Sequence, residues 1–177
     1  SEVDKLEKEV RDANERDRRN SERNRKENEE MLRRVERVLR ELKKKLEEAI
    51  RRARKVLDDD SPSEVIKELL KELKRLLEEI ARTLKRLLDE WKKLLDDSAE
   101  DSKRSLDELR RLLEKIRRDG LDERILERIE ELIRDNAKRN EDLLRRSKEM
   151  LDELRKKAKE ILDRIRKLIK EVEDKAR

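Results

Sequence analysis

The stretch that decides the fold is residues 58–80, DDDSPSEVIKELLKELKRLLEEI. Pro62 is the only proline in the chain. Ser61 lies directly before it, and Glu64 lies two residues after it. Ser61 is the expected N-cap, Pro62 suits the first helical position, and Glu64 completes a capping box. Apolar residues then recur every third or fourth position, at Ile66, Leu69, Leu73, Leu76 and Ile80. This pattern predicts that one helix ends before Pro62 and that a second, amphipathic helix begins there.

The only glycine, Gly120, marks a second connection in the sequence RRDGLDER. A glycine at this position typically ends a helix in the left-handed conformation, and Asp122 is then the expected N-cap of the next helix. Ser1, with Asp4 three residues later, gives a similar start signal at the beginning of the chain. The sequence therefore predicts helices near residues 2–59, 62–118 and 122–176.

These three segments have nearly equal lengths and short connections, which places sequential helices antiparallel. Apolar residues of the first helix recur about every 3.5 positions, a period typical of left-handed coiled coils. We predict an all-α fold, an up-down-up three-helix bundle that forms a single domain over residues 1–177. One alternative is a loop at DDSAEDS, residues 96–102, which would give four helices. That stretch has no glycine or proline, so a continuous helix is favoured.

Composition agrees with long packed helices. Charged residues make up 58% of the chain and apolar residues 32%, a balance that in many proteins indicates disorder. Here the 54 basic and 49 acidic residues nearly cancel, leaving a net charge of only +5. Glu, Lys, Leu and Arg dominate with a helical period, as in coiled coils and long-helix proteins.

The same composition argues against most biochemical activities. The chain has no His and no Cys, so the commonest general base and nucleophile are missing, as is the Glu-x-x-His pair of di-metal bundles. We expect no enzyme, no cofactor and no metal site. Basic residues are interleaved with acidic ones and Trp91 is the only aromatic residue, which argues against nucleic-acid binding. No apolar run suits a membrane span and no targeting signal is visible, so we expect a soluble protein, cytoplasmic on recombinant expression.

One stretch breaks the apolar pattern: residues 11–30, RDANERDRRNSERNRKENEE, contain Ala13 as their only apolar residue. If the heptad register continues through this stretch, Asp17, Asn20, Asn24 and Asn28 occupy core positions. Folding the chain at its two connections places residue x of the second helix level with residue 122 − x of the first and residue 240 − x of the third. All six asparagines of the chain then lie at one level, together with five of its eight serines: Ser21, Ser98, Ser102, Ser105 and Ser147.

We therefore predict a buried polar belt, bounded by Leu, Ile and Val core on both sides, in which residues 11–30 supply one third of an interhelical hydrogen-bond network. Its expected members are Asn14, Asn20, Asn24, Asn28, Ser98, Ser102, Ser105, Asn136, Asn140 and Ser147. Paired across helices, such groups fix register and partner choice. The alternative is that residues 11–30 form a solvated helix stabilised by ion pairs between its seven basic and seven acidic residues.

The sequence resembles computationally designed helical bundles with engineered buried hydrogen-bond networks. The resemblance rests on the single glycine and proline at connections, the Ser-Pro-Ser-Glu helix start, a core without Phe or Tyr, the Glu/Lys/Arg/Asp surface and the single Trp. It implies a structural scaffold without natural activity, whose belt fixes register. The alternative is an interaction module: the subunit of a homo-oligomer, or the three-helix half of a heterodimer or switch that accepts a designed partner helix.

Overall fold

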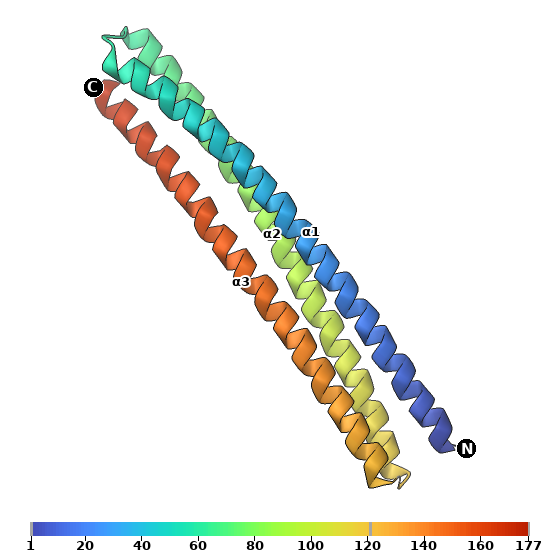
Figure 1. Ribbon diagram of the computed structural model, residues 1–177. Helices are drawn as coiled ribbons and strands as arrows, with labels where there is room; N and C mark the ends of the chain where they lie inside the picture. Colours follow the sequence, from blue (N-terminus) through green and yellow to red (C-terminus); the bar gives the residue numbers. More distant parts are fainter. Residues whose placement is uncertain (1, 121, 177) are drawn as a thin grey trace. The chain divides into compact units, whose positions relative to one another are not determined.

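A computed structural model describes residues 2–120 and 122–176, and the predicted three-helix, all-α architecture is confirmed. The helices are α1 (Glu2–Asp58), α2 (Ser63–Arg118) and α3 (Glu123–Ala176), each drawn as a continuous ribbon in Figure 1. Residues 96–102 lie inside α2, so the alternative with a loop there is wrong. Ser1, the expected start signal of the first helix, lies outside the described residues.

The helix ends lie within one residue of the predicted positions. The carbonyl oxygen of Pro62 accepts hydrogen bonds from the backbone N–H groups of Val65 and Ile66, at 3.0 and 3.3 Å. Pro62 therefore occupies the cap position itself, and α2 begins one residue later than predicted, at Ser63. Such a shift is small, because helix ends are the least sharply defined part of an element.

The second connection follows the prediction closely. Gly120 has a φ of 72°, the left-handed conformation expected after a helix, and its N–H donates to the carbonyl of Arg117 at 3.3 Å. Asp122 is the N-cap of α3, because its Oδ1 accepts a hydrogen bond from the backbone N–H of Arg124 at 3.3 Å. The predicted roles of Gly120 and Asp122 are confirmed.

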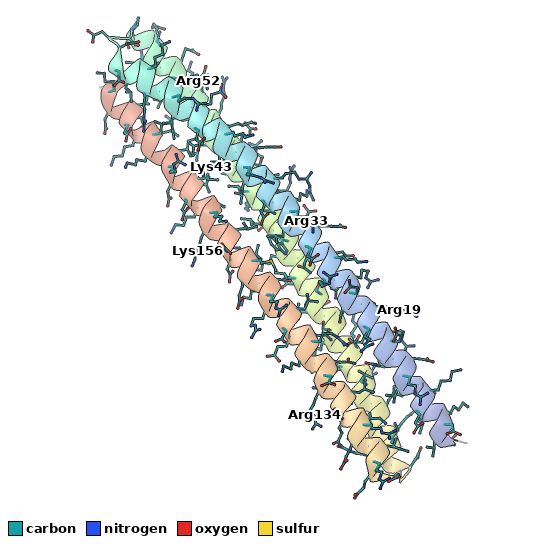
Figure 2. The ribbon with its side chains drawn as sticks, viewed as in Figure 1. Arg19, Arg33, Lys43, Arg52, Arg134 and Lys156 are labelled. Carbon is teal, nitrogen blue, oxygen red and sulfur yellow. The ribbon has the colours of Figure 1, made fainter. Side chains whose placement is uncertain are left out.

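The helices pack into two compact units, each built from one half of every helix. Unit 1 comprises the described residues of Ser1–Glu30 and Lys92–Glu149, and unit 2 those of Met31–Trp91 and Met150–Arg177. Within each unit the three helical segments pack against one another, and charged side chains such as those labelled in Figure 2 point away from the ribbons.

In unit 2, every buried residue described is apolar. Trp91, Leu46 and Ile165, one from each helix, are fully buried. Ion pairs on the flanks of the core show that α1 and α2 are antiparallel here, because the residue number of the partner on α2 falls as that on α1 rises. The pairs are Arg34 with Glu90, Lys45 with Glu79 and Arg52 with Glu72.

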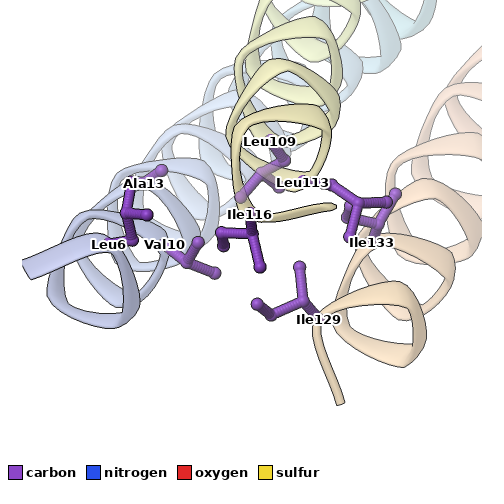
Figure 3. Close-up of a cluster of buried hydrophobic side chains, with 8 residues drawn as sticks. All are labelled: Leu6, Val10, Ala13, Leu109, Leu113, Ile116, Ile129 and Ile133. Carbon is purple, nitrogen blue, oxygen red and sulfur yellow. The ribbon is translucent and has the colours of Figure 1, made fainter. Parts of the chain in front are cut away.

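In unit 1, an apolar core occupies only part of the interior. Eight buried residues point toward one another between the three helical segments (Figure 3): Leu6, Val10, Ala13, Leu109, Leu113, Ile116, Ile129 and Ile133. Flanking pairs again join antiparallel neighbours, with Arg16 bound to Glu108 of α2 and Arg117 bound to Glu130 of α3. Buried polar residues occupy much of the remaining interior of unit 1, and they form the candidate site.

Candidate functional site: a buried polar network in unit 1

The buried polar residues of the described chain all belong to unit 1. They are Asp17, Ser21, Asn24, Asn28, Ser98, Asn136, Asn140 and Ser147. In α1 these residues continue the spacing of three or four that runs through Leu6, Val10 and Ala13, so the core-facing side of the helix is preserved while its chemistry changes from apolar to polar.

The first part of the network joins α1 to α3 through Asn136. Nδ2 of Asn136 donates to Oδ1 of Asn14 at 2.7 Å. Oδ1 of Asn136 accepts a hydrogen bond from Nη2 of Arg139, one turn further along α3. The same Nη2 reaches Oδ2 of Asp17 on α1 at 3.4 Å, a distance at the long end for a hydrogen bond but within the range of an ion pair.

The second part continues from Asp17 through Asn140. Oδ1 of Asp17 accepts a hydrogen bond from Nδ2 of Asn140 at 3.1 Å. Oδ1 of Asn140 accepts in turn from the hydroxyl of Ser21. Six side chains, three from α1 and three from α3, therefore form one continuous chain of hydrogen bonds: Asn14, Asn136, Arg139, Asp17, Asn140 and Ser21.

Other members of the predicted belt bond within their own helices. Nδ2 of Asn28 donates to the backbone carbonyl of Asn24 at 2.7 Å, and Ser98 of α2 donates to the carbonyl of Leu94 at 2.8 Å. A buried serine hydroxyl in a helix commonly satisfies itself in this way. Ser147 is buried on α3, whereas two further serines of α2 are half-buried: Ser102 and Ser105.

Asn20 lies differently from the prediction, which placed it at a core position. It is half-buried, and its Oδ1 accepts a hydrogen bond from Arg23 of the same helix, at 3.3 Å on the exposed side. Ser21 occupies the buried position instead. The heptad count used 3.5 residues per turn, whereas a straight helix has 3.6 and drifts about 20° per heptad, which turns residue 20 outward and residue 21 inward.

Sequence reasoning missed Arg139 altogether. It placed Asp17 at a core position and Ser21 at the level of the belt, but assigned neither to the network. Arg139 lies three residues after Asn136, which places the two side chains on one helix face, and it directly precedes Asn140. This spacing is the only sequence signal that could have predicted a role for Arg139 in the network. In a chain that is 58% charged, one further arginine carries little information by itself.

The electrostatics of the site centre on Asp17, whose side chain is 1% exposed and is therefore withdrawn from water. An unpaired buried carboxylate would be costly, and Arg139 supplies the opposite charge. The side chain of Arg139 is 37% exposed, so part of it still contacts solvent. The site can hold two helices together, but it contains no nucleophile with an adjacent base.

The described residues contain no group of three or more acidic side chains placed to hold a metal ion. Within the same residues, no helix has a stretch apolar enough and long enough to cross a bilayer.

Comparisons with known proteins give little further guidance. No protein-family model matches the chain, and no curated protein matches it. Among solved structures, the chain is similar to a protein described as a computationally designed three helix bundle, with 23% identity over 98% of this chain and 80% of that one, at a TM-score of 0.38. The fold and the site described above therefore rest on the residues of this chain.

Proposed function

We propose that this chain is a designed structural scaffold in which the buried polar network fixes the pairing of its helices. The observation that carries the proposal is the continuous chain of six hydrogen-bonded side chains between α1 and α3 in unit 1. The composition supports it, since the charged surface has no His or Cys and the connections use one proline and one glycine. No reaction follows from these residues, and none is proposed.

Apolar and polar cores differ in how well they define a register. A Leu-rich core that slides by one heptad meets a similar Leu-rich core and loses little free energy. A buried amide that loses its partner costs about 1–3 kcal/mol, so a network of amides strongly disfavours the wrong register. Buried polar residues in coiled coils are known to act in this way, at a cost in stability.

The proposal is tested with a leucine variant in which the whole network is made apolar: Asn14, Asp17, Asn136, Arg139 and Asn140 are replaced by leucine and Ser21 by alanine. We expect this variant to remain helical by circular dichroism but to lose its single conformation, because its α1–α3 interface becomes apolar and can pair in several registers. Light scattering should show mixed masses, and the amide spectrum should show several peaks per residue. Asn20→Ala is the matched control, since Asn20 is outside the buried network. A leucine variant that stays a single, sharp monomer would contradict the proposal.

The second candidate function is an interaction module, and one feature of unit 2 favours it. A pocket of about 540 Å³ lies between α1 and α3, lined by Leu39, Leu154 and Ile161 together with six charged side chains. Apolar side chains flanked by charged ones are a pattern that amphipathic partner helices bind. Light scattering on the unmodified chain separates the two functions. A mass of 21.6 kDa at all concentrations supports the scaffold, whereas a multiple of that mass, or a rise in mass when a partner helix is added, supports the module.

A further inference from the structure

We propose that the ion pair of Asp17 and Arg139 sets the donor–acceptor direction of the whole network, with Arg139 as a positioning residue that selects how α1 pairs with α3 in unit 1. This inference rests on the proposed function and deepens it. The sequence-based prediction contained only asparagines and serines, whose groups can bond in either direction. The structure places one cation and one anion among them.

Asparagine alone cannot define a direction. Its carboxamide has an oxygen that accepts and a nitrogen that donates, at two ends of nearly the same shape, so either end can face a given neighbour. A guanidinium only donates, and an ionised carboxylate only accepts. A charged group beside an amide therefore determines which end of that amide faces it.

Each bridging amide of the network has one end held by a charge. Arg139 donates to Oδ1 of Asn136, so Nδ2 of Asn136 is the end that faces Asn14 across the interface. Asp17 accepts from Nδ2 of Asn140, so Oδ1 of Asn140 remains to accept from Ser21. The two charges together account for the orientation of both amides and for the order of all the bonds.

The same arrangement works against shifted pairings. If α3 moved by one heptad in either direction, the position of Asn136 opposite Asn14 would be taken by Ile129 or by Leu143. Asn14 would then lose its partner, and the geometry that brings Arg139 to Asp17 would be lost with it. Charge-assisted hydrogen bonds are about twice as strong as neutral ones, so the ion pair further stabilises the observed register relative to shifted ones.

The position of Arg139 also explains how an ion pair fits into this interior. Asp17 is buried, whereas the side chain of Arg139 is 37% exposed, so the carboxylate is withdrawn from water further than its partner. One nitrogen, Nη2, makes both contacts to Asp17 and Asn136, and the buried Nε has no acceptor among the described residues. Arg139 therefore acts by orienting its neighbours through a single nitrogen.

The test uses the side-chain amide signals of Asn136 and Asn140 in nitrogen-15-labelled full-length protein. In Arg139→Gln, we expect the Asn136 signals to move and their hydrogen exchange to become at least about tenfold faster, because the acceptor end of that amide is released. In Asp17→Asn, the Asn140 signals should respond in the same way. The double variant should show both changes together, because each charge holds a different amide.

Arg16 and Glu108 provide the matched control, because they form an exposed ion pair between α1 and α2 one residue away from Asp17. The variant Arg16→Gln with Glu108→Gln removes an interhelical ion pair of similar kind and should leave the Asn136 and Asn140 signals unchanged. If Arg139→Gln folds and both amides keep their signals and exchange rates, the proposed role of the ion pair is overturned.

A second variant keeps the test decisive if Arg139→Gln does not fold. Arg139→Lys retains the charge but lacks the planar guanidinium, so we expect a folded protein in which the Asn140 signals persist and the Asn136 signals move. Unchanged Asn136 signals would overturn the inference. The scaffold function can fail separately: a leucine variant of the whole network that remains a sharp monomer would refute register control, even if Arg139 orients the amides of the unmodified chain.

Discussion

At the scale of single residues, Gly120 is the clearest case of a conformation that dictates an amino acid. Its φ of 72° is one that residues with a Cβ adopt only at a cost, while a Cβ built there would meet no atom within 4 Å. We therefore expect Gly120→Ala to lower the free energy of unfolding by about 1 kcal/mol, purely through backbone strain. Urea denaturation followed by circular dichroism measures this loss.

Gly120→Asn is the matched comparison, because asparagine tolerates the left-handed conformation better than alanine. The asparagine variant should fall between the parent and the alanine variant. Equal losses for both substitutions would show that the cost does not come from the backbone conformation, since both residues add the same Cβ.

The polar residues show where sequence reasoning stops. Asn24, Asn28, Asn136 and Asn140 were placed in the belt by counting, and all four are buried. Counting cannot say which partner a buried amide takes, because that depends on rotamers and on differences of less than one turn between helices. Asn20 illustrates this limit, since the drift of about 20° per heptad that separates a straight helix from a heptad count makes Ser21 the buried residue.

At the scale of elements, ion pairs along the flanks of the helices add a pH-dependent contribution. Nζ of Lys45 on α1 lies 2.9 Å from Oε1 of Glu79 on α2, and this hydrogen bond raises the pKa of Lys45 above its ordinary value of 10.5, with the charge of Glu79 adding to the effect. Because the pKa is higher in the folded state, the contribution is fully present below pH 10.5 and is lost as the pH rises through the folded-state pKa.

We expect Glu79→Gln to lower the free energy of unfolding at pH 7 by less than about 1 kcal/mol, since both side chains are about half exposed and screened by solvent. Well above pH 10.5 the parent and the variant should have the same stability, because Lys45 is then neutral. Urea titrations at both pH values measure this. Glu78→Gln, one residue away, is the control, and a difference that persists at high pH would contradict the assignment.

The elements themselves could be predicted well because their signals are local. A proline, a glycine and an aspartate at the connections, together with apolar residues every third or fourth position, define three helices to within one residue. The contribution of α2 to the network could not be predicted in the same way. Ser98 lies at the expected level, but its hydroxyl donates to the Leu94 carbonyl of its own helix, a competing bond that a level count does not include.

At the scale of the whole molecule, apolar and polar interiors are distributed unequally over the chain. The buried residues described in unit 2 are apolar, whereas unit 1 combines an apolar cluster with the polar network. A buried leucine contributes about 1.5–3 kcal/mol. An intramolecular hydrogen bond contributes a net of about 0.5–1.5 kcal/mol. Per buried side chain, unit 1 therefore gains less free energy on folding than unit 2.

We accordingly expect native-state hydrogen exchange to be slowest in unit 2. Backbone amides near Leu46 should exchange at least about tenfold more slowly than those near Asn24, although both lie on α1, because local opening costs less where the interior is polar. Exchange followed by nuclear magnetic resonance, corrected for the intrinsic rate of each sequence, measures the difference. Equal protection along α1 would contradict this ranking.

The leucine variant of the whole network, defined above, separates stability from specificity in the same experiment. Replacing buried polar groups with well-packed apolar ones is often neutral or stabilising, so amides of unit 1 should become at least as protected as in the parent, even while the variant loses its single conformation. A fall in protection would mean that the network is the main source of stability in unit 1. A rise accompanied by several conformations would mean that this chain gives up stability there to obtain one defined pairing of α1 with α3.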